Sequence, residues 1–242
     1  MCHKCFPNRI RVSLTLCAIF AIAPDGLLAS VVVTNGDFEA PGTNVSTGGF
    51  AQGVPGWGER NNNSGFPAFS DFLIIGDATA HGAYLDGQTA GISNHVGDNG
   101  YLYQEVGTAD GKPTVQVTGV NFWRNDNSNQ HGPLAVAMYW LPSTDGFAFT
   151  EVGNDILGVG TLINSFVVPD PVSQNSVAPF DLAFDVSSLS SDARLFLRFD
   201  AASITNFAYV DNVTVQAIPE PSTLVLTVLA LLGLLAHGHR RA

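Results

Sequence analysis

Short runs of apolar and polar residues, separated by Gly, Asn, Asp and Pro, fill the chain between residues 31 and 217. Runs of this length that are rich in β-branched and aromatic residues are typical of β-strands. Along residues 195–200, two leucines and Phe199 alternate with Phe196, Arg198 and Asp200, which predicts one core face and one partly solvated face. We expect strands at residues 31–33, 72–75, 101–106, 114–123, 134–141, 165–168, 180–186, 193–199 and 208–216.

No segment of ten residues in this region has the period of a helix, and no convincing internal repeat is present. A stretch of about 190 residues is long enough to bury the core of one domain. Many short strands with turn signals between them favour a β-sandwich or a jelly roll. We therefore predict an all-β fold, with a single β-sandwich over residues 31–217.

The N-terminus carries a basic segment followed by an apolar one. Lys4, Arg9 and Arg11 precede the apolar residues 12–23, an order typical of a signal peptide. Cleavage after Ala23 and cleavage after residue 29 or 30 both fit, and we favour the later position. Residues 1–30 are therefore predicted to be a signal peptide. They contain all three cysteines, so the mature domain is expected to hold neither disulfides nor thiolate metal sites.

The C-terminus has three parts, which are Pro219, Glu220 and Pro221, then an apolar run over 224–236, then Arg240 and Arg241. The prolines fix their own φ angles and remove two donors, so an extended stretch is expected there. We predict a transmembrane segment at about residues 222–236, although this run is shorter than the roughly 20 residues that cross a bilayer untilted. By the positive-inside tendency, the basic tail would lie on the cytoplasmic side. The alternative is a buried terminal helix of the domain.

These three parts, in this order, resemble the PEP-CTERM sorting signal of Gram-negative and related bacteria. The resemblance covers residues 218–242. It implies recognition by an exosortase-type processing enzyme, transient anchoring in the inner membrane, cleavage near the motif, and delivery to the cell surface or the extracellular matrix.

Charge narrows the choice of partners. Residues 31–218 contain five basic residues and nineteen carboxylates, and five minus nineteen gives a net charge of −14. Such a surface repels phosphate backbones, so nucleic-acid binding is disfavoured. Divalent cations and neutral polymers are the natural partners.

Four motifs carry a second resemblance, and they lie at residues 33–39 (VTNGDFE), 55–57 (PGW), 102–106 (LYQEV) and 207–215 (FAYVDNVTV). Together they resemble a galactose-binding-like jelly roll, as found in carbohydrate-binding modules of the family 4 and 9 type. The resemblance covers nearly the whole domain. It implies that the first and last strands lie side by side.

Similar domains often hold a structural calcium ion near these terminal motifs. Carried over to this chain, the resemblance implies Glu39 and Asp211 as ligands, with Asp37 as a weaker candidate. Calcium needs six to eight oxygen ligands, which two neighbouring loops can supply. The alternative is that Asp37 caps a turn and that Asp211 hydrogen-bonds within an edge strand.

A sugar site would need aromatic faces beside polar side chains. Trp123 is the better candidate ring, because its strand ends in a polar loop with Arg124 and Asp126, and Tyr84 is a second. Most aromatic side chains in a sandwich are core, and we expect Trp57 to be structural.

Catalysis has little support in the sequence. His81, His95 and His131 are scattered through loops, without a metalloprotease or nucleophile-elbow pattern. Only Asp126 and His131 form a cluster that merits inspection. We expect a non-catalytic structural or interaction protein that associates with extracellular polysaccharide. The alternative is a lectin-like carbohydrate-binding module with a discrete glycan site, and a polysaccharide-active enzyme is a remote third.

Overall fold

A computed structural model describes residues 31–38, 50–51, 54, 56–59, 71–75, 88–93, 101–122, 131–150, 155–173, 176–203 and 207–218. The predicted signal peptide, Glu39, Tyr84, Trp123, Arg124, Asp126 and the tail from Pro219 lie outside these residues. Among the described residues, no helix has the length and apolar character needed to cross a membrane.

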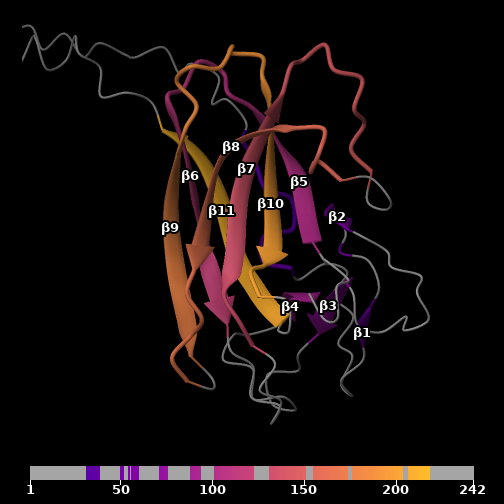
Figure 1. The fold of residues 1–242 in the computed structure, drawn as a ribbon, viewed down its shortest axis with the longest axis vertical. Helices are drawn as coiled ribbons and strands as arrows, with labels where there is room; N and C mark the ends of the chain where they lie inside the picture. Colours follow the sequence, from indigo (N-terminus) through magenta and orange to yellow (C-terminus); the bar gives the residue numbers. More distant parts are fainter. Residues whose placement is uncertain are drawn as a thin grey trace, which may run out of the picture.

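The described chain forms two antiparallel sheets that face one another (Figure 1). The six-stranded sheet has the order β1-β3-β4-β11-β6-β9, and its strands are β1 (Phe50–Ala51), β3 (Asp71–Ile75), β4 (Gln88–Ser93), β11 (Phe207–Ile218), β6 (Thr114–Phe122) and β9 (Val177–Asp185). The five-stranded sheet has the order β2-β5-β10-β7-β8, with β2 (Gly58–Glu59), β5 (Tyr101–Thr108), β10 (Arg194–Ala201), β7 (Leu134–Leu141) and β8 (Thr161–Val168). The predicted all-β, two-sheet fold is confirmed.

The core fills the space between the two sheets. Alternate residues of each strand point inward, so Val115 and Val117 of β6 meet Leu195, Leu197 and Phe199 of β10, and all five are buried. Burying a side chain of this size stabilises the fold by about 1.5–3 kcal/mol each. The apolar residues at alternate positions of the sequence thus define the face of each sheet that points into the core.

The strands of the structure differ from the expected ones at several positions. Residues 31–33 form no strand, because residues 34–37 form a turn in which Asn35 has a φ of 52°, and Phe38 follows with a φ of 54°. β4, with the sequence QTAGIS, lacks the β-branched and aromatic richness that marks a strand and was not expected. β8 begins at Thr161, earlier than expected.

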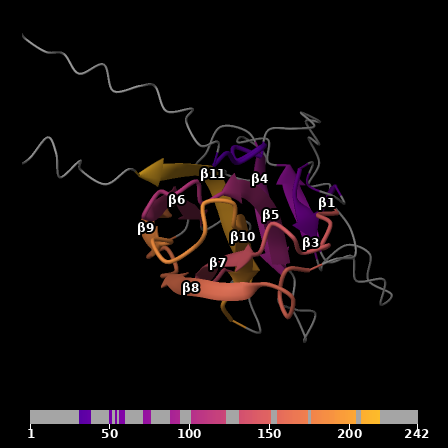
Figure 2. The same cartoon turned by 90° about the horizontal axis from the view of Figure 1, so that it is seen from above.

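The expected solvation of the outer face of β10 is also wrong. Phe196 is fully buried and Arg198 is only 4% exposed. The connection between β7 and β8 runs over this face, and the ring of Phe147 packs edge-on against Phe196 at 5.7 Å between centroids. Ile156 from the same connection is also buried. The described residues of this connection, 142–150 and 155–160, which we call the covering segment, lie alongside β5 and β10 (Figure 2).

Candidate functional site

Gln104 of β5 joins two of the sequence motifs. Its side-chain amide accepts a hydrogen bond from the backbone N–H of Thr34 (2.7 Å). It also donates to the carbonyls of Thr34 (3.0 Å) and Gly56 (2.5 Å). Gln104 is 3% exposed, so its hydrogen bonds are shielded from competing water. The motif around Gln104 therefore fixes the N-terminal segment and the turn before Trp57.

Trp57 lies in the core. Its ring packs between Phe38 and Phe199, with centroid separations of 5.4 and 5.5 Å, and its indole N–H donates to the carbonyl of Asn35 at 3.2 Å. A buried tryptophan needs such a partner for its N–H. Trp57 thus has a structural position, as its motif indicated.

The first and last motifs also meet. The backbone N–H of Val213 donates to the carbonyl of Gly36 at 2.8 Å. A Cβ atom at Gly36 would lie 2.1 Å from the carbonyl oxygen of Val213, so only glycine allows this approach. β11 bulges between Asp211 and Thr214, and Asn212 has a φ of 53° there. The expected proximity of the two terminal motifs is present.

This junction contains two of the three residues implied as calcium ligands. Asp211 is 2% exposed and accepts a hydrogen bond from the backbone N–H of Asn212 at 2.6 Å, whereas Asp37 is exposed. Glu39 lies outside the described residues. Within the described part of the chain, no three His, Cys, Asp or Glu side chains are grouped as they would be around a metal ion. Calcium at this junction therefore stays a prediction.

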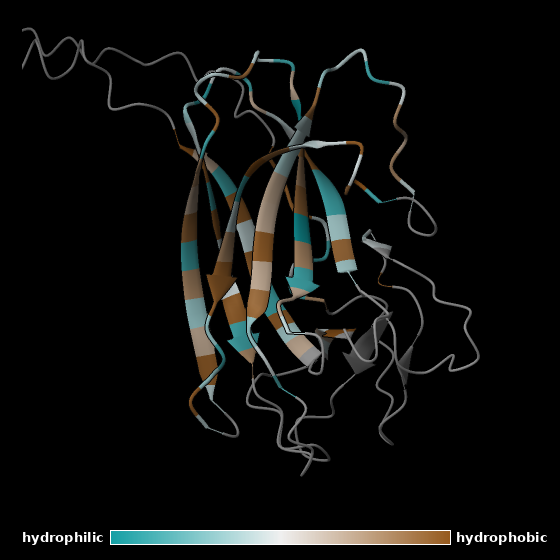
Figure 3. Cartoon of the chain, in the orientation of Figure 1, coloured by the Kyte–Doolittle hydropathy of each residue, from teal (hydrophilic) through white to brown (hydrophobic). Residues whose placement is uncertain are grey.

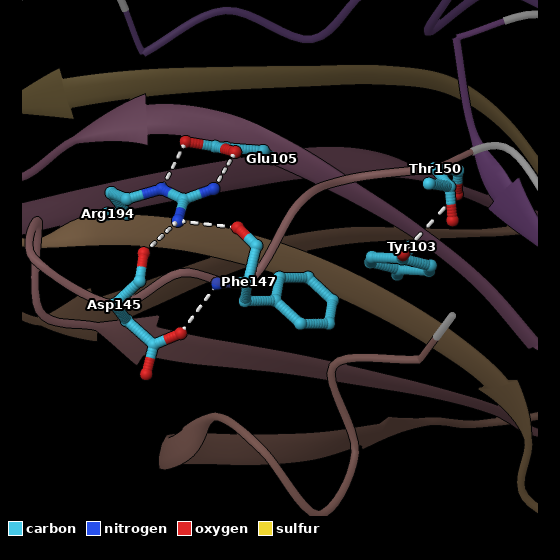
Figure 4. Close-up of polar contacts among 6 residues, drawn as sticks. All are labelled: Tyr103, Glu105, Asp145, Phe147, Thr150 and Arg194. Carbon is cyan, nitrogen blue, oxygen red and sulfur yellow. Dashed lines mark hydrogen bonds and ion pairs between the residues drawn. The ribbon is translucent and has the colours of Figure 1, made fainter.

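The outer face of the five-stranded sheet holds an ion pair that anchors the covering segment (Figure 4). Arg194 donates to both carboxylate oxygens of Glu105, at 2.9 and 2.6 Å, and to the carbonyl of Phe147 at 2.8 Å. The hydrogen bonds to Glu105 raise the pKa of Arg194. Tyr103, whose pKa is raised by burial, donates to the carbonyl of Thr150 at 3.3 Å.

A second group, which we name the Arg198 cluster, comprises Tyr101, Tyr139, Asp155, Arg198 and Asp200. The guanidinium of Arg198 lies 4.6 Å above the centre of the Tyr101 ring. It donates to both oxygens of Asp155, at 3.0 and 3.2 Å, and also to Asp200. The two carboxylates remain partly accessible, with side-chain exposures of 21% for Asp155 and 27% for Asp200.

Burial is the main influence on ionisation in the Arg198 cluster. It raises the pKa of Asp200 to about 6, an effect that Arg198 opposes and the nearby carboxylate of Asp155 reinforces. Burial likewise raises the pKa of Tyr139. The cluster therefore offers accessible carboxylate oxygens, one of which gains a proton in mildly acidic solution.

The third polar group lies at one end of the sandwich. Asn121 of β6 is fully buried, and its amide donates to the carbonyls of Gly132 and Pro169, each at 3.1 Å. His131 lies 2.6 Å from a carboxylate oxygen of Asp170, measured from its Nδ1. The cluster suspected at Asp126 and His131 is tested only in part, since Asp126 lies outside the described residues.

Sequence reasoning missed the Arg198 cluster and Asp170. One signal was available, because two of the five basic residues of an acidic domain stand four residues apart on the same face of β10. Asp170 carried no such signal, since it meets His131 only through the fold.

No protein-family model and no curated protein matches this sequence. Among solved structures, the chain is similar to the Stig cyclase Fisc from Fischerella sp. TAU, crystallised with an indole compound, at 14% identity and a TM-score of 0.56 over 77% of this chain and 96% of that one. An apo cyclase from Fischerella sp. matches at 13% identity and a TM-score of 0.56, over 79% and 98% of the two chains. The chain shares the fold of these proteins.

The xylan-binding domain CBM22-2 from Paenibacillus barcinonensis also matches, at 11% identity and a TM-score of 0.41, over 68% of this chain and 93% of that one.

Proposed function

We propose that the protein is exported, processed at its C-terminal tail by an exosortase-type enzyme, and associates without catalysis with polysaccharide at the cell surface or in the extracellular matrix. The predicted signal peptide and the tail from Pro219 to Arg241 support export and processing. The excess of nineteen carboxylates over five basic residues supports a neutral polymer as partner rather than a nucleic acid.

The observation that carries polysaccharide association is the Arg198 cluster. Sugars offer hydroxyl donors, and the partly exposed carboxylates of Asp155 and Asp200 are acceptors held in place by Arg198. Because Arg198 already orders these side chains, a glycan would find them preorganised, which lowers the entropy cost of binding. Trp123 with Arg124 and Asp126, and also Tyr84, remain the proposed aromatic and polar partners from the loops.

A polysaccharide pull-down and a glycan array with the purified full chain test this proposal. Asp200→Asn and Asp155→Asn should each weaken binding, and Trp123→Ala should abolish binding at a discrete glycan site. Asp181→Asn is the matched control, because Asp181 is an exposed carboxylate on β9 that bonds only Gln116 among the contacts described. Absence of binding to every polysaccharide would contradict the proposal. Loss of binding in Asp181→Asn as well would indicate a general effect of charge.

We further propose structural calcium at Glu39, Asp211 and Asp37. An ion that binds only the folded state raises the melting temperature. The full chain should therefore melt at a higher temperature with calcium than with chelator, and Asp211→Asn should remove the difference. Equal melting temperatures in the wild-type protein would exclude this site.

Acid catalysis is a second candidate function, favoured by one observation. A carboxyl with a pKa of about 6 beside Tyr101 and Tyr139 can donate a proton in mildly acidic solution. The test is turnover of polysaccharides between pH 5 and 7. Activity that Asp200→Asn abolishes and Asp181→Asn retains would favour an enzyme over a binding protein.

A further inference from the structure

Among the described residues, the polar end of the sandwich contains two buried side-chain oxygen atoms that no donor reaches. Asn121 stands opposite Val210 of β11, and its amide reaches residues that precede β7 and follow β8. It therefore ties one sheet to the other. Asp170 directly follows Pro169, whose carbonyl accepts one of these hydrogen bonds. The side chains of Asn121 and Asp170 therefore belong to the same end of the fold.

The hydrogen bonds of Asn121 and Asp170 show which of their side-chain atoms have no partner among the described residues. Asn121 uses its Nδ2 group on the carbonyls of Gly132 and Pro169, so its Oδ1 must be the other atom of the amide. This Oδ1 is buried and has no hydrogen-bond partner within the described part of the chain. Oδ1 of Asp170 is likewise buried and has no hydrogen-bond partner among the described residues, whereas its Oδ2 is bonded to His131. Both unsatisfied atoms are acceptors, and buried acceptors are normally paired.

The chemistry of these two oxygen atoms indicates which kind of ligand would bind them. A ligand that meets only acceptors must bring positive charge or donors, and a carboxylate, an amide oxygen and carbonyl oxygens are the ligands that hard cations prefer. The carbonyls of Gly132 and Pro169 each keep a second lone pair beyond the bond to Asn121. His131 holds the carboxylate of Asp170 through its other oxygen, the arrangement in which an outer hydrogen bond orients a metal ligand.

We propose that this end of the sandwich binds a calcium ion through Oδ1 of Asn121 and Oδ1 of Asp170. The carbonyls of Gly132 and Pro169 are the neighbouring oxygens that can add to the coordination. This site is distinct from the one proposed at the terminal motifs, because Asp211 lies on β11 at the bulge and its Oδ1 is bonded to the backbone of Asn212. Calcium here would link β6 of one sheet to the ends of β7 and β8 of the other.

Calorimetric titration of the purified, chelator-treated full chain with calcium chloride tests the proposal. Asp170→Asn should weaken one class of sites by about tenfold or more and should reduce the rise in melting temperature that calcium produces. Asp181→Asn makes the same change of charge at an exposed carboxylate and should titrate like the wild type. Asp211→Asn should leave this class of sites intact, which separates the two proposed locations.

Two results would overturn the proposal. One is a calcium titration of Asp170→Asn that matches that of Asp181→Asn in stoichiometry and affinity. The other comes from the crystal structure of the wild-type protein grown with calcium. This experiment is informative even if Asp170→Asn does not fold. An anomalous peak about 2.3–2.6 Å from the two oxygens would support the site. A water molecule bonded to both oxygens, without an anomalous peak, would overturn the proposal.

Discussion

The outer faces of the two sheets differ although both lie outside the same core. On the six-stranded sheet, neighbouring strands present exposed polar pairs, such as Gln116 with Asp181 at 2.6 Å and Thr118 with Thr214 at 2.7 Å. On the five-stranded sheet, Phe196 and Arg198 are buried beneath the covering segment. Figure 3 shows hydrophilic bands along β9 of the six-stranded sheet and along β5 and β10 of the five-stranded sheet, so polar residues are present on both sheets. Coverage, rather than composition, separates the two faces.

This difference shows what a covering segment does to charged residues. On an open face, an ion pair contributes little because water screens it. Under the covering segment, Arg194 and Arg198 lose water and are satisfied by carboxylates and carbonyls, so breaking one of these hydrogen bonds leaves another group buried without a partner. The following predictions compare the covered face with the open one.

The largest effect is expected for Phe196→Ala on the covered face. The ring is fully buried against Phe147, and its removal leaves a cavity, so the free energy of unfolding should fall by about 3–5 kcal/mol. Urea denaturation measures this change. Thr214→Ala on the open face is the control, and a similar loss there would contradict the contrast between the faces.

Arg194→Lys should have the next largest effect. Lysine cannot bond both oxygens of Glu105 and the carbonyl of Phe147 together, so the free energy of unfolding should fall by about 1–3 kcal/mol. Hydrogen exchange at the amide of Phe147, which donates to Asp145 at 2.7 Å, should accelerate. Unchanged exchange at that amide would mean that Arg194 does not anchor the covering segment.

The pH dependence of stability isolates Asp200. Its folded pKa of about 6 lies above the ordinary value of 3.8, so the folded state binds the extra proton. The free energy of unfolding should therefore fall as pH rises from about 4 to 6, by about 1–2 kcal/mol from this group, and then level off. Asp200→Asn should remove this part of the curve.

Other carboxyls act in the opposite direction, so only the difference between the two proteins is informative. Hydrogen bonds lower the pKa values of Asp185 and Asp192, whose stabilising effect is lost as pH falls. Both groups are present in the wild type and in Asp200→Asn. Superimposable curves for the two proteins between pH 4 and 6 would show that the pKa of Asp200 is not raised.

The smallest effect is expected for Thr118→Val on the open face. The variant loses one exposed cross-strand hydrogen bond to Thr214 but gains a residue that suits a strand, so stability should change by no more than about 0.2–1 kcal/mol. Urea denaturation of Thr118→Val and of Phe196→Ala under the same conditions gives the comparison. A loss above 2 kcal/mol would mean that the open face is also tightly coupled to the core.

The period of two predicted most strands that pack both sheets, because Val115, Val117, Leu195 and Leu197 show it plainly. It could not predict that Phe196 and Arg198 are buried, since that depends on a covering segment which lies between β7 and β8 in sequence. β4 was missed because its small and polar residues carry no strand signal, although its neighbours β3 and β11 complete its hydrogen bonds.

The candidate sites divide in the same way. The sequence indicated that the terminal motifs meet, and the bond from Val213 to Gly36 bears this out. The pairing of His131 with Asp170 and of Arg198 with Asp155 was not predictable, because each joins residues far apart in sequence that only the folded sheets bring together. Trp123, Tyr84, Arg124, Asp126 and Glu39 remain predictions from sequence.

The bond between Gly36 and Val213 also bears on how the chain folds. The N-terminal segment is held by Gln104 in the middle of the chain and by the bulge within β11, the last strand. Contacts between residues this far apart are slow to form, because a long loop must close before they stabilise anything. If the chain is exported N-terminus first, its opening residues must wait for the last strand to emerge. Complete folding would then coincide with arrival of the proposed sorting tail at the membrane.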